Sequence, residues 1–266
     1  MTILEIPVFD IRELEKNKTV ISSSKGNQPK WKVDNLWLKQ DYFGYESVAE
    51  VLASNILESS RLPSDYYVTY RPCTITTHTG QQTGCYSQDF RGTLTEKPLG
   101  RLLEEHLIDI NSAMSKRTTE EALSILVTTI EKLTRIPYTV VDTHLRLLFA
   151  FDALTFNEDR HLNNILFLTD GFQYRFAPIF DNGLAFLSDV KTYRNGVNLT
   201  ALERSAKPVL LTKSFDKHVT LYKGDPFINR PVLKELLTTH QEYYGRAGNL
   251  LYRRLTNKKY DHLFYD

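Results

Sequence analysis

The first 90 residues carry mainly the patterns of β-strands. Residues 66–75 and 83–90 are rich in Tyr, Thr, Val and Ile, and residues 31–39 place an Asp34-Asn35 turn between bulky side chains. These patterns predict two antiparallel strands and a hairpin. Residues 45–57 instead space their apolar side chains as on one face of a helix, which Pro63 would stop. This part of the chain is therefore predicted to be β-rich with one helix.

From residue 99 onward the spacing becomes helical. Residues 99–110, 119–134 and 138–156 each carry helical apolar spacing, and Thr118 supplies an N-cap followed by acids in the first turn. Residues 184–230 are loop-rich, and residues 232–258 predict one or two terminal helices. The fold class is thus α+β and bilobal, with a small β-rich lobe (residues 1–90) and a larger, mostly helical lobe (residues 91–266).

The segment 157–183 is the strongest candidate for chemistry. Two apolar runs, 165–168 and 174–180, are joined by a turn at Asp170-Gly171, a pattern typical of a β-hairpin. Asp159 and Asn164 precede the hairpin and Asp181 follows it, so the three should converge at one end. Two carboxylates and an amide oxygen suit Mg²⁺, which shares its ligand shell with phosphates. Protein kinases arrange an Asp, an Asn five residues later and a second Asp in this way.

A simpler interpretation is that these residues only form turns. Asp and Asn are common turn formers, and their spacing here arises by chance in many proteins. The hairpin, the second acid at its far end and the Arg160-His161 pair favour phosphotransfer.

Composition narrows the class of protein only a little. The chain has 266 residues, a formal net charge of +1 and two cysteines, which do not predict nucleic-acid binding, a disulfide framework or a zinc site. No run approaches the length of a membrane span, and the first 17 residues lack the apolar core of a signal peptide. We expect synthesis in the cytoplasm, which leaves secretion as an effector open. A basic cluster at 246–259 is interpreted as a solvated helix face.

The small lobe offers the further parts that a kinase needs. Residues 22–30, SSSKGNQPK, lie between predicted strands, where backbone N–H groups and hydroxyls would hold phosphate oxygens. Lys39 ends a strand, as a phosphate-binding lysine should, although most lysines only lie at the surface. Glu46, at the start of the next helix, would pair with Lys39, unless it merely stabilises the helix dipole. Glu50, one turn later, is the alternative partner.

With these parts in place, the sequence resembles the HipA-like serine/threonine kinases, in particular their shorter branch. The resemblance rests on FNEDRHLNNILFL and FAPIFDNG, and it extends to SSSKGNQPK, LWLK with YESVAEVLASNIL, and CYSQDF. It covers residues 19 to 187. One departure is Phe156, which stands where the family has Gly before the catalytic loop (residues 157–164).

The resemblance implies a role for each matching residue. Asp159 would be the catalytic base, His161 would support the loop and contact phosphate, and Lys39 would bind the α/β-phosphates of ATP. Asn164 and Asp181 would bind Mg²⁺. The remaining nucleotide contacts would come from Ser23, Ser24, Gly26 and Glu46, and from Gln88 and Phe90 at the hinge to adenine. Autophosphorylation would occur at Ser23 or Ser22, adding negative charge to the loop.

The function expected from this resemblance is ATP-dependent phosphorylation of a protein Ser or Thr by a toxin or effector kinase, with a small antitoxin as a partner and without direct contact to nucleic acid or membrane. A phosphoinositide-type lipid kinase is one alternative, since such enzymes also use DRHxxN. A nucleotide-binding pseudokinase acting as an interaction module is another. A binding module without nucleotide is disfavoured by the completeness of the site.

Overall fold

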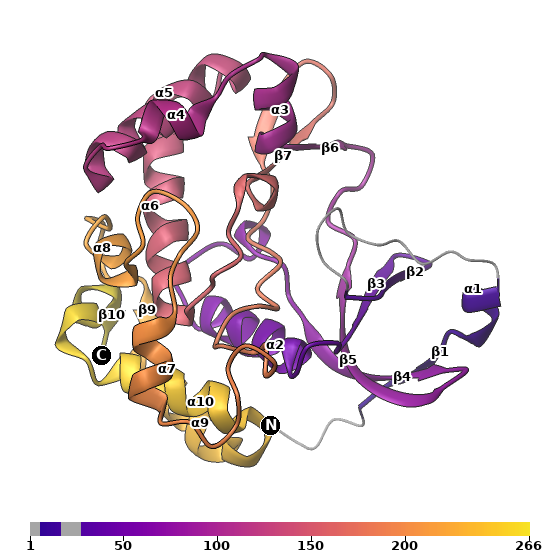
Figure 1. The fold of residues 1–266 in the computed structure, drawn as a ribbon. Helices are drawn as coiled ribbons and strands as arrows, with labels where there is room; N and C mark the ends of the chain where they lie inside the picture. The colour runs from indigo at the N-terminus through magenta and orange to yellow at the C-terminus, as the bar shows by residue number, and fades with distance from the viewer. Residues whose placement is uncertain (1–5, 17–27) are drawn as a thin grey trace.

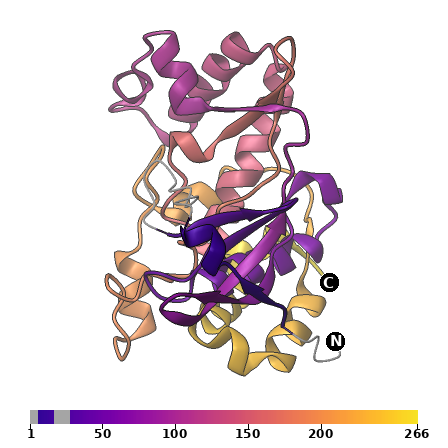
Figure 2. The same ribbon diagram turned by 90° about the vertical axis from the view of Figure 1, so that its right-hand side faces the viewer.

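A computed structural model describes residues 6–16 and 28–266. Figure 1 shows a twisted sheet from the first part of the chain on the right and a larger, mostly helical part on the left. Seen from the side in Figure 2, the sheet lies in front of the yellow C-terminal helices, and the magenta and pink helices extend above both. None of the helices in the described ranges is long and apolar enough to span a bilayer.

The sheet has five strands in the order β1-β4-β5-β3-β2. The predicted turn is confirmed: Asp34 takes a left-handed φ of 51° between two antiparallel strands. A short helix, α1, was not predicted. The elements of this part are β1 (Val8–Asp10), α1 (Arg12–Lys16), β2 (Lys30–Val33), β3 (Leu36–Gln40), α2 (Glu46–Glu58), η1 (Ser64–Tyr66), β4 (Arg71–Thr77) and β5 (Gly80–Gln88).

The helical prediction for the rest of the chain is mostly confirmed. Thr118 forms a capping box with Glu121, which fixes the start of α5. The helix expected over 99–110 is interrupted, because Leu107 takes a left-handed φ of 55°. The elements up to the central hairpin are β6 (Thr95–Pro98), α3 (Leu99–Glu105), α4 (Ile110–Met114), α5 (Thr119–Thr134), α6 (Tyr138–Thr155), η2 (Leu162–Asn164), β7 (Leu166–Thr169) and β8 (Tyr174–Phe176).

The hairpin β7–β8 forms as predicted and gains β6 as a third strand, in the order β6-β7-β8. The terminal helices also form, and α10 is kinked at Gly245, which has a φ of 46°. The remaining elements are α7 (Leu199–Ser205), α8 (Phe215–Val219), β9 (Ile228–Asn229), α9 (Arg230–Thr239), α10 (Gln241–Leu255), η3 (Lys258–Leu263) and β10 (Phe264–Tyr265).

Two of the three apolar clusters formed by the described residues hold these parts together. A small one lies on one face of the five-stranded sheet, around Trp31, Leu38 and Ile75. The large one joins α5, α6 and α10 and also takes in the buried face of α2. The lobe boundary proposed at residue 90 falls between β5 and β6. It stays a prediction, since α2 packs with the C-terminal helices as well as with the sheet.

Candidate active site

A buried lysine links the sheet to the central hairpin. Lys39, on β3, is 5% exposed, and its Nζ lies 2.7 Å from Oδ1 of Asp181, 142 residues away. Its Nζ also bonds to Oε1 of Glu50 on α2. Two consecutive elements, β3 and α2, therefore meet the distant end of the hairpin at one ammonium group.

The charges of Lys39, Asp181 and Glu50 stabilise one another. Burial opposes the charge on Lys39, but the carboxylates of Asp181 and Glu50 outweigh burial and raise the lysine pKa well above its usual value. Burial likewise favours the neutral form of Asp181, yet Lys39 and then Lys30 hold the pKa of that carboxyl far below its usual range. Both side chains are consequently charged at neutral pH.

The expected pairing of Lys39 with Glu46 was wrong, and the alternative partner, Glu50, is the one that the structure shows. Glu46 does not reach Lys39; its carboxylate accepts hydrogen bonds from the backbone N–H groups of Tyr42, Phe43 and Gly44, at 2.6–3.1 Å. These three residues lie in the connection between β3 and α2, so the Glu46 carboxylate fixes the backbone that leads into the helix. Glu50, one turn later and fully buried, binds Lys39 through Oε1 and accepts the Asn182 N–H through Oε2 at 2.9 Å.

The catalytic loop holds the other candidate acid. The side-chain amide of Asn164 donates to the carbonyl oxygen of Asp159 at 2.8 Å. Nε2 of His161 lies 3.9 Å from Oδ1 of Asp159, and Nδ1 of His161 is buried without a hydrogen-bond partner. Burial raises the pKa of Asp159; His161 opposes the shift and Asp181 adds to it. Asp159 and Asp181 therefore lie close enough to interact.

Arg160 fastens the catalytic loop to the segment that carries Asp181. It is 3% exposed and pairs with the buried Asp152 of α6 at 3.1 Å. Its guanidinium also donates to the Phe180 carbonyl oxygen and to Oδ1 of Asn182, both at 2.8 Å. A single planar group with five donors thereby joins α6, the catalytic loop and both neighbours of Asp181.

Two bends beside the site use left-handed backbone. Phe156, where the family has Gly, ends α6 with a φ of 54°, and Asp181 has a φ of 57°. This conformation costs a non-glycine residue roughly 1–2 kcal/mol. Phe156 is 1% exposed and packs under the Arg254 guanidinium at 3.7 Å, so packing outweighs the cost.

The structure describes only some of the residues that are predicted to contact the nucleotide. Ser22, Ser23, Ser24 and Gly26 lie outside the described residues. Gln88 ends β5, and Phe90 packs on Phe180 with ring centroids 5.6 Å apart, next to an apolar cluster. That cluster consists of Leu166, Leu168 and Ala177, with Leu94 beside it.

The residues predicted to hold a metal fit one. The amide nitrogen of Asn164 donates to the Asp159 carbonyl oxygen and lies 3.5 Å from Oδ2 of Asp159, which leaves the amide oxygen of Asn164 to act as a ligand. Residues 6–16 and 28–266 contain no group of three or more His, Cys, Asp or Glu side chains placed for a metal. Mg²⁺ would therefore rest on few protein oxygens and take the rest of its shell from phosphates and water.

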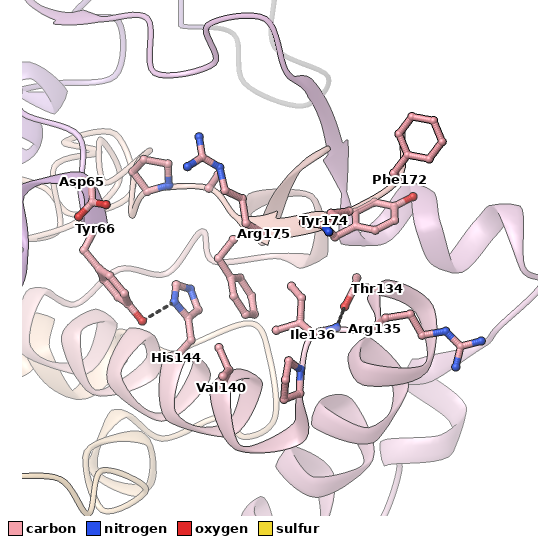
Figure 3. A pocket seen from close by; sticks show the side chains of 15 residues that line it. Asp65, Tyr66, Thr134, Arg135, Ile136, Val140, His144, Phe172, Tyr174 and Arg175 are labelled. Atoms are coloured by element: carbon pink, nitrogen blue, oxygen red, sulfur yellow. Dashed lines mark hydrogen bonds between the residues drawn. The ribbon is translucent and has the colours of Figure 1, made fainter. Parts of the chain in front are cut away.

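A cavity of about 600 Å³ lies on another side of the hairpin, against the corner between α5 and α6 (Figure 3). None of the predicted site residues lines it. His144, on its wall, stacks on Phe176 of β8 with centroids 3.8 Å apart and shares a 3.0 Å hydrogen bond with the Tyr66 hydroxyl. Burial, and then Arg160, lower the pKa of His144 to about 3, so the ring is neutral. The cavity wall thus supports the strand that leads to Asp181.

Sequence reasoning missed Asp152 and assigned Arg160 no contact. A signal was present: Asp152 is a single acid within the apolar helical run FAFDALTF, where an acid needs a buried partner. Arg160, eight residues later in the adjoining loop, supplies this partner.

No family model matches the sequence, and no curated protein matches it. Among solved structures, the chain is similar to the Helicobacter pylori proinflammatory kinase CtkA, with a TM-score of 0.56 and 17% identity over 94% of this chain and 95% of CtkA. The chain has the fold of CtkA. The bilobal, kinase-like α+β fold implied by the sequence resemblance is confirmed.

A second, weaker similarity is to a structure from Shewanella oneidensis MR-1, the complex of the toxin–antitoxin proteins HipA and HipB with operator DNA. It has a TM-score of 0.47 and 14% identity over 90% of this chain, which spans 65% of the matched one.

Proposed function

We propose that this protein is an ATP-dependent serine/threonine protein kinase of HipA type. The observation that carries the proposal is the convergence of Lys39, Glu50 and Asp181 from β3, α2 and the end of the hairpin. Burying a charged lysine between two carboxylates costs folding free energy, because three charges are desolvated. Such clusters are often found at functional sites. A phosphate chain bound beside them would use both the lysine and the acid.

The residues divide the proposed work between them. Lys39 would bind the α/β-phosphates and Glu50 would orient it, while Phe90 and its apolar neighbours would offer a surface to adenine at the hinge. Asp159 would orient the acceptor hydroxyl and take its proton. Asn164 and Asp181 would hold Mg²⁺, which supplies charge neutralisation of the phosphates when bound. The phosphoryl transition state is loose, so positioning and charge account for most of the catalysis.

The finer parts of the proposal rest on the sequence resemblance. They are a protein Ser or Thr as acceptor, autophosphorylation at Ser22 or Ser23, a role as a toxin or effector made in the cytoplasm, and a small antitoxin as partner. The Shewanella HipA and HipB proteins form such a toxin–antitoxin pair.

Intact-mass spectrometry after incubation with Mg·ATP tests the function, with Asp159→Asn as the matched variant. We expect the wild type to gain phosphate, mapped to Ser22 or Ser23, and the variant to bind ATP without gaining any. ATP binding without phosphate gain in the wild type would support the pseudokinase alternative. Absence of ATP binding would refute the proposal.

The acceptor is tested separately, by offering protein and phosphoinositide substrates side by side. Transfer to protein Ser or Thr is expected. Transfer to the lipid alone would replace the proposal with a lipid kinase.

A further inference from the structure

One arginine of α10, the helix that packs beside α2 (Figure 1), binds the segment that follows the hairpin. Arg246 is half-buried. Its guanidinium donates to the carbonyl oxygens of Leu187 and Tyr193, both at 2.6 Å, and its Nε donates to the Tyr45 hydroxyl at 2.7 Å. Leu187 and Tyr193 both follow Asp181 in the chain, so Arg246 holds the segment that continues from this acid.

The Tyr45 hydroxyl extends this contact to α2. Tyr45 is the N-cap of α2, the helix that carries Glu50. Its hydroxyl accepts from Arg246 and donates to the Phe186 carbonyl oxygen at 2.7 Å. Burial raises the pKa of Tyr45, with Arg246 opposing the shift, so the hydroxyl keeps the proton that it donates. The start of α2 and the segment after the hairpin are therefore joined through one hydroxyl group.

The backbone that receives these hydrogen bonds is strained. Phe186 and Leu187 are 0% and 1% exposed, and both take left-handed φ values, of 53° and 55°. Such a conformation costs each non-glycine residue free energy, and it persists only where surrounding contacts fix it. The carbonyl oxygens of these two residues are the ones that Tyr45 and Arg246 bind. The two side chains thus help to hold a bend that the backbone alone disfavours.

The far end of the same segment contacts the catalytic loop. The Tyr193 hydroxyl donates to Oε2 of Glu158, the residue before Asp159. The other oxygen of Glu158 accepts the Lys207 N–H at 2.7 Å. Because Arg246 binds the Tyr193 carbonyl oxygen, a continuous set of contacts runs from α10 to α2 and to the catalytic loop.

We propose that Arg246 is a positioning residue for phosphotransfer. Through Tyr45 it fixes the start of α2, and through Tyr193 it fixes the catalytic loop, so that Glu50 and Asp159 keep their places relative to each other. This inference rests on the proposed function and extends it to a residue outside the kinase motif segments. A purely structural alternative is that Arg246 only fastens α10, which would lower stability without slowing transfer by the folded protein.

Transfer kinetics separate these roles. Phosphate incorporation is followed in single turnovers over a range of Mg·ATP concentrations, below the unfolding transition, for the wild type, Arg246→Gln, Arg246→Lys and Tyr45→Phe. Arg253→Gln is the matched control, because Arg253 is an exposed arginine of the same helix whose partner is Glu203, at 2.7 Å.

We expect Arg246→Gln to lower the maximal rate about tenfold or more, since it loses charge-assisted hydrogen bonds. The half-saturating ATP concentration should change less than twofold, because Arg246 acts on positioning and not on nucleotide binding. Tyr45→Phe should slow transfer several-fold, and Arg246→Lys should recover part of the rate. Arg253→Gln should match the wild type.

Two further readouts address the coupling itself. The double variant Tyr45→Phe/Arg246→Gln should lose less than the product of the two single losses, because the two side chains share one hydrogen bond. Amide hydrogen exchange, followed by mass spectrometry, should be faster in Arg246→Gln at residues 184–193 and 157–164 and unchanged in β4 and β5.

A maximal rate within twofold of the wild type in Arg246→Gln, or equal losses in Arg246→Gln and Arg253→Gln, would overturn the inference and leave the kinase proposal intact. If Arg246→Gln fails to fold, Tyr45→Phe decides by the same comparison. Unchanged exchange in the catalytic loop would also overturn the inference, whether or not phosphate transfer is detected. Absence of ATP binding by the wild type would instead refute the kinase proposal itself.

Discussion

Replacing Glu50 by Gln tests how the site is held together. In the structure, one carboxylate oxygen binds Lys39 and the other accepts the Asn182 N–H. A glutamine has one acceptor oxygen, and its amide nitrogen would face one of these two donors. The substitution therefore removes a charge and turns one hydrogen bond into a contact between two donors. Glu46→Gln is the matched control, since it lies one turn earlier on α2 and does not reach Lys39.

The expected loss of stability follows from the burial of Glu50. Glu50 is 0% exposed, and breaking a buried ion pair by removing one partner costs about 3–5 kcal/mol of unfolding free energy. Glu46→Gln should cost about 1.5–3 kcal/mol, since it weakens hydrogen bonds from backbone N–H groups to a charged acceptor but breaks no ion pair. A loss of about 1.5–3 kcal/mol in the positioning of Lys39 corresponds to a roughly 10- to 150-fold lower phosphotransfer rate for Glu50→Gln. The rate of Glu46→Gln should stay near that of the wild type.

Urea unfolding followed by circular dichroism gives the stabilities, and single-turnover phosphate transfer below the unfolding transition gives the rates. The reasoning is wrong if Glu46→Gln loses transfer while Glu50→Gln keeps it. Equal stability losses in the two variants would also contradict it, whether or not transfer is detected.

Three further predictions concern the supports of the site. Arg160→Met should lower the unfolding free energy by about 3–5 kcal/mol, because the buried carboxylate of Asp152 loses its cationic partner and keeps only the hydrogen bond from Asn157; adding Asp152→Asn should restore part of the lost stability in the same urea titration. His144 should destabilise the protein in acid: its folded pKa is lowered from 6.5 to about 3, so its contribution is complete above pH 6.5 and is lost as pH falls toward 3. Between pH 7 and 5 the wild type should lose about 2 kcal/mol more than His144→Gln, and equal losses would contradict the assignment. Phe156→Gly should destabilise by about 2 kcal/mol or more, since lost packing exceeds the relief of left-handed strain; a more stable variant in thermal unfolding would show the reverse balance.

The sequence determined the local structure well. The hairpin that carries Asp181 was predicted from two apolar runs and an Asp-Gly turn, and the start of α5 from Thr118. Both depend on interactions within a few residues, where turn chemistry and capping act. The kinase-like fold was predicted too, because the motif residues occur in a fixed order along the chain.

Partners across the fold were decided by tertiary structure. Glu46 and Glu50 occupy the same helix, and only the placement of α2 against β3 shows that Glu50 meets Lys39. The basic cluster at 246–259 was interpreted as a solvated face, but Arg246 donates to the Leu187 and Tyr193 carbonyl oxygens and Arg254 is 8% exposed. Spacing along a chain reports which side chains share a face of one element. It does not report which other element covers that face, because the covering element is set by long-range packing. In this protein, that packing buries Arg254 and pairs Arg246 with backbone carbonyl oxygens.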